Sequence, residues 1–475
     1  MRRALSFSVL LVWAGVGCTQ LPSVEADGGL IDGGGLLPDS GNAPDSGQPD
    51  DAGVDAGVKS DAGFEAFNPG SVPTGVLQAT FGELTVMQLN LPTGVALQLG
   101  EAAIIVGPDG TVVLLDIGNS SHDDDVRTAL EQLNTTVLTP ARGFSARSKL
   151  QVEWVVITHF HGDHVGSAGA LLKTGDAKAL TVTKGIVHRG LVDLGANAVN
   201  NGAYNSFCTA VTQGFAQKNR PLCIQGGAAP PCNTAQFSGS YAATSCPGLT
   251  QGDIETSADD AQQLPAFISL GGGARLTFTS ADTYVFDGQS TQSVASFGVT
   301  ENEHENARSV SGVISYGDFR YHFGGDMTGG GKNTPDVETP FIAKAGPLHY
   351  GVFGADVIHA HHHARDSSSN AALAGALAPV DGNSRNVVAG INTAYGDAPS
   401  PPVLSTWTDN NRLNTGRLWI TEKVLTGNEN AKVTNAKGPV IVQTVQHGIG
   451  YWVQAAGSSL SSQAYESVRH LHRGQ

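Results

Sequence analysis

The sequence predicts a layered α/β protein, and three observations support this class. Short apolar segments typical of strands alternate with segments that have the apolar spacing of helices. The chain has 475 residues, of which 40% are hydrophobic and 15% charged, enough for a sizeable core. One strand-like segment ends at a dense cluster of histidine and aspartate residues. We therefore expect a single large domain whose chemistry lies at strand ends.

The elements follow in order from about residue 81. Residues 84–89 and 101–106 have strand patterns, and Pro108, Asp109 and Gly110 predict a hairpin turn. Residues 123–133 predict a helix, because acids fill the first turn and apolar residues recur at helical spacing. Further strands are expected at 154–158, 266–285, 310–316, 319–323, 386–391, 418–422, 440–445 and 451–454.

The strongest functional signal follows the strand expected at 154–158. Residues 159–164 read His-Phe-His-Gly-Asp-His, so three imidazoles and one carboxylate lie close together. Gly162 permits the tight turn that points them to one side. These donors suit Zn²⁺ or another borderline divalent ion, and burying them without a partner would be costly. The sequence predicts a metal site here, followed by a helix through Leu172.

This segment and three others resemble the metallo-β-lactamase superfamily. Residues 111–118 are similar to the family's second strand, which ends in Asp-x-Gly, here Asp116 to Gly118. Residues 323–326 are similar to the strand end whose carboxylate bridges two metals, and residues 356–363 to the strand with the last histidine ligand. The resemblance implies an αββα four-layer sandwich that holds two divalent ions, Zn²⁺ in the first place or else Mn²⁺. A disulfide-stapled insertion, expected from the cysteines below, is extra to the family pattern.

The resemblance also implies a role for each matching residue. The implied metal ligands are His159, His161, Asp163, His164, His304, Asp326, His362 and His363. The first two would hold one metal, Asp163 and His164 the other, and Asp326 would bridge both. The last ligand would be His362, with His363 as the alternative. The third histidine of the first metal would be His304, with His188 or neither as the alternatives. A metal-bridged hydroxide would attack the substrate, with Asp163 as proton shuttle, while Asp116 would support the ligand turn.

The C-terminal half is similar to the hydrolase domain of ComEC-type DNA-uptake proteins. Asn306 to Ser309 match its Asn-x-x-Ser, and residues 392–402 resemble its Asn-x-Tyr-Gly-His-Pro, with Asp397 in place of the histidine. This branch implies phosphoester hydrolysis by a phosphodiesterase or nuclease-like enzyme. Arg365 and Ser367 to Ser369 either contact a phosphate or, for the serines, cap a helix. A lactam, lactone or thioester hydrolase, or a non-enzymatic surface binding protein, remains an alternative.

The N-terminus predicts export. Residues 1–18 resemble a lipoprotein signal peptide, which implies an outer-membrane lipid anchor on Cys18; ordinary secretion is the alternative. Residues 19–66 form an acidic low-complexity segment, and 21–66 hold ten acids against one lysine. Such a segment cannot bury enough surface to offset its chain entropy, so we expect a flexible tether ahead of a hydrolase domain at 67–475.

Four further cysteines lie in an insertion expected at about 190–262, mostly as loop. Their even number in an exported protein predicts two disulfides among Cys208, Cys223, Cys232 and Cys246, with a second metal site as the lesser alternative. The net charge of −16 predicts no strong nucleic-acid footprint. The sequence does not indicate the oligomeric state.

Overall fold

The computed structural model describes residues of one unit, which spans Phe64–Gln475. The described residues are 65–91, 100–173, 175, 178–189, 201–211, 219–222, 267–282, 284–287, 291–293, 305–380, 387–391, 399–408, 412–413, 417–421, 433–457 and 459–473. Among them, no helix combines the length and apolar character that a membrane span requires.

The first sheet has nine described strands in the order β19-β18-β17-β1-β2-β3-β4-β5-β6. Their bounds are β1 (Thr85–Gln88), β2 (Ala103–Val106), β3 (Val112–Leu115), β4 (Gln151–Ile157), β5 (Thr181–His188), β6 (Asn219–Pro221), β17 (Val440–Val445), β18 (Gly450–Ala456) and β19 (Leu460–Glu466). β3, β4, β5 and β6 run parallel, so the carboxyl ends of β3 and β4 share one edge.

The second sheet has ten described strands in the order β10-β9-β8-β11-β12-β13-β14-β15-β16, and β7 pairs with β8. Their bounds are β7 (Phe267–Gly271), β8 (Ala274–Ala281), β9 (Tyr284–Phe286), β10 (Thr291–Ser293), β11 (Ser311–Tyr316), β12 (Phe319–Phe323), β13 (Val357–Ile358), β14 (Val387–Ile391), β15 (Leu418–Ile420) and β16 (Val433–Asn435). β12 and β13 run parallel, so their carboxyl ends also share an edge.

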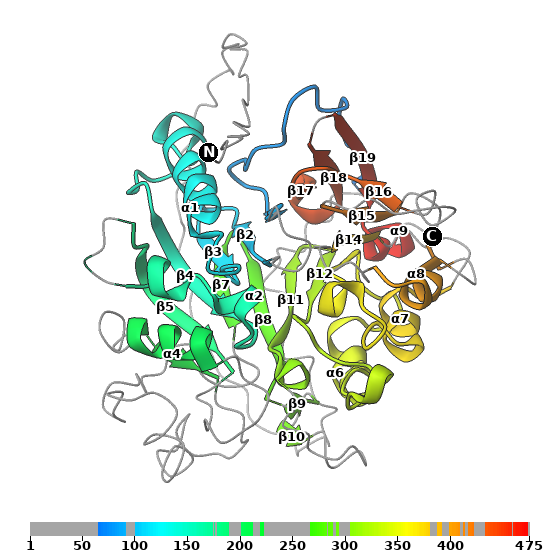
Figure 1. The fold of residues 1–475 in the computed structure, drawn as a ribbon. Helices are drawn as coiled ribbons and strands as arrows, with labels where there is room; N and C mark the ends of the chain where they lie inside the picture. The colour runs from blue at the N-terminus through cyan, green and yellow to red at the C-terminus, as the bar shows by residue number, and fades with distance from the viewer. Residues whose placement is uncertain are drawn as a thin grey trace, which may run out of the picture. The chain divides into compact units, whose positions relative to one another are not determined.

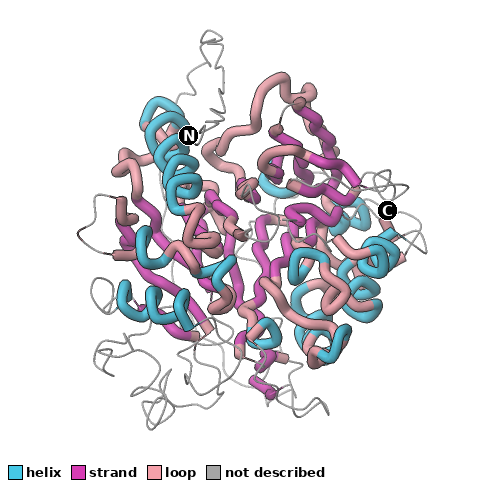
Figure 2. Tube along the Cα trace, in the orientation of Figure 1, coloured by secondary structure: helices cyan, strands magenta, loops and turns pink. Residues whose placement is uncertain are grey.

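The two sheets pack face to face. Alternate residues of the first sheet, such as Val113 and Val156, share one buried cluster with Phe278 and Phe323 of the second. The opposite faces carry helices, because the intervening residues of each strand are also apolar. Figure 2 shows strands in the middle of the folded part and helices on both sides.

Helices cover the outer face of each sheet (Figure 1). On the first sheet lie α1 (Asp123–Gln132), α2 (Gly162–Val165), α3 (Ala168–Leu171) and α4 (Asn201–Ala210). On the second lie α6 (Glu338–His349), α7 (Ala371–Leu377) and α8 (Pro401–Thr408). α9 (Val468–Arg473) follows β19. The mixed α/β class and the layering agree with the sequence prediction.

The insertion differs from its prediction in its described part. α4 was expected as loop, but it buries Tyr204 and Phe207 against Phe160 of the ligand turn, with ring centroids 4.7 and 5.2 Å apart. The sequence pattern did not indicate this helix, because alanine, asparagine and glycine are frequent in it and only its inner face is apolar. Cys208 is buried on α4, while the other three cysteines lie outside the described residues, so the disulfides stay a prediction.

The first described segment lies along the last strands of the first sheet. The amide of Asn68 donates to Gln446 Oε1 at 2.7 Å, and the indole of Trp452 donates to the carbonyl of Pro69 at 3.2 Å. β1 then pairs antiparallel with β17, and Thr85 lies opposite Gln443. The two ends of the described chain therefore build one side of the sheet together.

Asp356 should be required as a carboxylate, because it joins α9 to β12. Its Oδ1 accepts the Val468 amide and its Oδ2 accepts the Arg320 amide, both at 2.7 Å. An amide side chain can accept only one of them, so Asp356→Asn should lower the free energy of unfolding by about 1–3 kcal/mol. Urea denaturation would measure this against Asp109→Asn, an exposed aspartate. Equal effects of the two substitutions would contradict the assignment.

Candidate metal centre

The ligand turn leaves β4 at its carboxyl end, at the edge that β3 shares. α2 begins at Gly162 directly after His161, so the imidazoles of His159, His161 and His164 project from one tight turn. Phe160 between them is fully buried in the helix layer. The alternation of donors and one large apolar side chain fixes which residues face the site.

Glu305 and Arg189 hold this turn from behind. Glu305 Oε1 accepts the Phe160 amide at 2.8 Å, and the Arg189 guanidinium contacts both carboxylate oxygens, at 2.9 and 2.5 Å. Arg189 is 1% exposed and also contacts Asp282 at 3.0 Å. A buried charge needs such pairing, so the network fixes the turn rather than adding net stability.

Asp116 orients His164. Its carboxylate accepts the amide and the hydroxyl of Thr158, each at 2.8 Å, and its Oδ2 lies 2.8 Å from His164 Nδ1. Burial raises the pKa of Asp116, while His164 acts in the opposite direction. With Nδ1 engaged, Nε2 of His164 is directed at Asp326, which agrees with the supporting role expected for Asp116.

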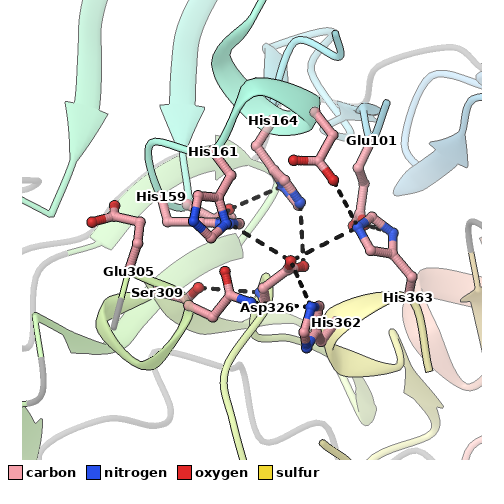
Figure 3. Close-up of polar contacts among 12 residues, drawn as sticks. Glu101, His159, His161, His164, Glu305, Ser309, Asp326, His362 and His363 are labelled. Atoms are coloured by element: carbon pink, nitrogen blue, oxygen red, sulfur yellow. Dashed lines mark hydrogen bonds and ion pairs between the residues drawn. The ribbon is translucent and has the colours of Figure 1, made fainter. Parts of the chain in front are cut away.

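Asp326 lies at the centre of the site (Figure 3). Its Oδ1 is 3.2 Å from His164 Nε2, and its Oδ2 is 3.6 Å from His159 Nε2. The Nε2 atoms of His362 and His363 lie 3.7 and 3.8 Å from Oδ2. Gly325 precedes it with φ +52°, and a Cβ there would lie 2.7 Å from Thr158 Cβ. The close approach of the two sheets therefore requires glycine at this turn.

Two groups of donors meet at Asp326. His159, His161 and Asp326 form one, and Glu101, His164, Asp326 and His363 form the other, with donor atoms within 4.8 Å of one another. Five of the predicted residues are thus brought together: His159, His161, His164, Asp326 and His363. The shared carboxylate is the arrangement that a two-metal site needs.

The remaining predicted residues have different positions. Asp163 Oδ2 faces His363 Nε2 at 3.2 Å and belongs to neither donor group. His363 rather than His362 belongs to the second group, and His362 lies beside Asn306 at 3.0 Å. His304 lies outside the described residues. His188 is buried between Phe160 and Phe207, with ring centroids at 5.8 and 5.4 Å, and joins neither group.

Glu101 is a site residue that the sequence reasoning missed. β2 runs antiparallel to β3, with Ala103 opposite Leu115, so the start of β2 lies beside the end of β3. Glu101 lies two residues before β2 and therefore reaches the edge where Asp116 lies. The signal in the sequence was a single glutamate at the start of an otherwise apolar segment, Glu101 to Val106; in the structure its side chain is buried.

The loop that carries His362 and His363 has an unusual backbone. His362, His363 and Ala364 have φ values of 48°, 53° and 60°, each of which costs free energy in a residue other than glycine. Side chains of the following serines compensate: Ser367 Oγ lies 2.6 Å from His362 Nδ1, and Ser368 Oγ donates to the His361 carbonyl at 2.7 Å.

The helix-cap expectation for Ser367, Ser368 and Ser369 was wrong. The three serines are buried at 1–5% exposure and contact their own loop or Glu338. The cap of α7 is Asn370, whose side chain accepts the Leu373 amide at 2.9 Å. These serines therefore do not cap α7, while the phosphate contact expected of them and of Arg365 stays a prediction.

The electrostatics of the cluster call for positive charge. Burial would raise the pKa of Asp163, but His164 and His363 hold it well below its usual range. Burial would lower the pKa of His363, but Asp326, Asp163 and Glu101 raise it to about 9. By contrast, burial lowers the pKa of His362 to about 4. The buried carboxylates thus favour the protonated, positively charged form of His363. Divalent cations could supply this positive charge in place of the proton.

The residues fit a divalent metal. His164 Nε2, Asp326 Oδ1 and Glu101 Oε2 are buried and make no hydrogen bond. Buried polar atoms in that state cost free energy, and their convergence is explained if they ligate a cation. Imidazole and carboxylate donors suit Zn²⁺ and similar ions.

Replacing Asp116 by asparagine should weaken metal binding. The variant loses the acceptor that orients His164, and loss of such outer partners typically lowers metal affinity by about 10–100-fold. Competition with a chromophoric chelator would measure this, with Asp125→Asn on α1 as the control for charge. Unchanged affinity in Asp116→Asn would exclude the orienting role.

Comparisons with known proteins show to which family the chain belongs. A family model described as the metallo-beta-lactamase superfamily matches residues 98–374, more than half of the chain. No curated protein matches the sequence significantly. A solved structure of a metallo-beta-lactamase HARLDQ motif mutant S60 from Cronobacter sakazakii (Enterobacter sakazakii) is 13% identical, with a TM-score of 0.26, and the match covers 54% of this chain and 70% of that chain. On the family match, this chain belongs to the metallo-β-lactamase superfamily, whose members are usually hydrolases that bind divalent metals such as zinc.

Proposed function

We propose that this protein is an exported metal-dependent hydrolase of phosphoester bonds, a phosphodiesterase or nuclease-like enzyme. The observation that carries the proposal is the single carboxylate, Asp326, shared by two donor groups. When bound, two divalent ions, Zn²⁺ or Mn²⁺, would activate a water molecule and stabilise the charge that develops on the phosphoryl oxygens. No nucleophile from the protein is then needed.

Different residues of the chain would hold the ions, accept a proton and support the ligand turn. His159, His161 and Asp326 would hold one ion, and His164, His363 and Asp326 the other. Asp163 lies beside the site outside both donor groups, so its Oδ2 is placed to accept a proton from the attacking water. Glu305 and Asp116 keep the ligand turn in place throughout.

The Asn-x-x-Ser segment supports the phosphoester branch. Asn306 Nδ2 lies 3.0 Å from His362 Nε2, and Ser309 Oγ accepts the Asp326 amide at 3.1 Å. Both residues of the motif thus contact residues of the candidate site, and this placement supports the proposal. Lactams, lactones and thioesters remain the alternative substrates for the same donors.

His161→Ala should abolish phosphodiester hydrolysis. The substitution removes one imidazole of the first donor group, so metal content should fall from about two ions per chain, and turnover of bis(p-nitrophenyl)phosphate should fall at least about 100-fold. His472→Ala, on α9 against Phe353, is the matched control and should keep both.

Other outcomes would redirect the proposal. Two metals without phosphodiester turnover would point to the lactam, lactone or thioester alternative. No metal after loading with Zn²⁺ and Mn²⁺ would leave a non-enzymatic binding protein. Equal loss in His161→Ala and His472→Ala would show that the histidine assignment is wrong.

Export belongs to the same proposal. The segment that ends at Cys18 supports a lipid anchor in the outer membrane, and an oxidising compartment would allow the disulfides predicted at Cys208, Cys223, Cys232 and Cys246. The substrate would be a small or polymeric phosphoester, and the net charge of −16 argues against broad nucleic-acid binding.

Cys18→Ala should move the protein out of the membrane fraction. The expected result is a protein recovered with the soluble envelope or in the medium, because the residue that would carry the lipid is gone. Fractionation with immunodetection would measure this, and Asp109→Asn, at an exposed position, is the control. If the Cys18→Ala protein stays with the membrane, the lipid anchor is ruled out.

A further inference from the structure

The two donor groups differ in chemical character. The first has two imidazoles, from His159 and His161, for one carboxylate. The second has two carboxylates, from Glu101 and Asp326, beside the imidazoles of His164 and His363. Imidazole suits Zn²⁺, whereas carboxylate oxygen suits harder ions such as Mn²⁺. The neighbours extend this difference, because His362 lies near the shared carboxylate while Asp163 lies 3.2 Å from His363.

Glu101 is held firmly in the second group. Its amide donates to the Asp163 carbonyl at 2.8 Å, and its carbonyl accepts the Gly118 amide at 2.9 Å. These bonds connect it to the ligand turn on one side and to the end of β3 on the other. The backbone of Glu101 is therefore fixed by these hydrogen bonds, and this fixes the position of its side chain beside His363.

The Glu101 carboxylate has one oxygen engaged and one directed at the site. Oε1 lies 2.8 Å from His359 Nε2, whereas Oε2 lies 3.3 Å from His363 Nδ1 and makes no hydrogen bond. Figure 3 shows the carboxylate beside His363 and across from His164. An oxygen buried in this way is costly unless it meets a cation.

We propose that Glu101 is a metal ligand that tunes the second position to a harder ion such as Mn²⁺, so that the two positions hold different metals. The proposal rests on the proposed two-metal site, but it concerns binding rather than turnover. Failure of phosphodiester hydrolysis would therefore leave it standing.

The test uses the full chain, stripped of metal and loaded with one equivalent of Zn²⁺. Mn²⁺ or further Zn²⁺ is then titrated, with Mn²⁺ followed by electron paramagnetic resonance and Zn²⁺ by a competing chelator. In Glu101→Gln, Mn²⁺ affinity should fall at least about tenfold, and more than the affinity for the second Zn²⁺. The control is Glu153→Gln, which changes a glutamate on β4 that pairs with Arg147. Its affinities for Mn²⁺ and Zn²⁺ should equal those of the parent protein.

Two results would overturn the proposal: unchanged Mn²⁺ affinity in Glu101→Gln, or an equal fall for both metals. Circular dichroism would check that the variant folds. If it does not, Glu101→Asp keeps the charge and shortens the side chain by one methylene. It should still lower Mn²⁺ affinity more than Zn²⁺ affinity, and an equal or absent effect there would also reject the proposal.

Discussion

The site depends on one constraint: strand ends from two different sheets must meet. His164 follows β4 of the first sheet and Asp326 follows β12 of the second, and their side chains approach to 3.2 Å. Gly325 makes this possible, because any larger residue would collide with Thr158. A small shift between the sheets would separate both donor groups at once. The packing of the apolar inner faces is therefore also what sets the distances between donors.

Local patterns predicted the parts of the site that follow a strand directly. His159, His161 and His164 were identified because they crowd the turn after an apolar strand, whereas Asp326 was identified by the resemblance of its strand end to that of the family. Glu101 was missed because its position depends on the antiparallel pairing of β2 with β3, which the sequence does not state. The same holds for α4, whose apolar face becomes evident only when Phe160 is placed against it.

The choice between His362 and His363 could not be made from sequence for a different reason. Three successive residues have positive φ, so the alternation of side chains expected after a strand does not apply there. The loop keeps this form through buried polar contacts: His361 Nδ1 lies 2.7 Å from Glu338, and its Nε2 lies 2.8 Å from His322. Histidines outside both donor groups thus still determine where the candidate ligands point.

The pairing of β1 with β17 has a consequence for how the chain is made. Thr85 and Gln443 are neighbours in the sheet but far apart in sequence, so the first strand emerges from the ribosome long before its partner. Until then one edge of β1 has no partner, and an open apolar edge can pair with other chains. Contacts of such long range also slow folding, since a large loop must close first. The nascent chain would thus depend on being kept from aggregation until its last strands arrive.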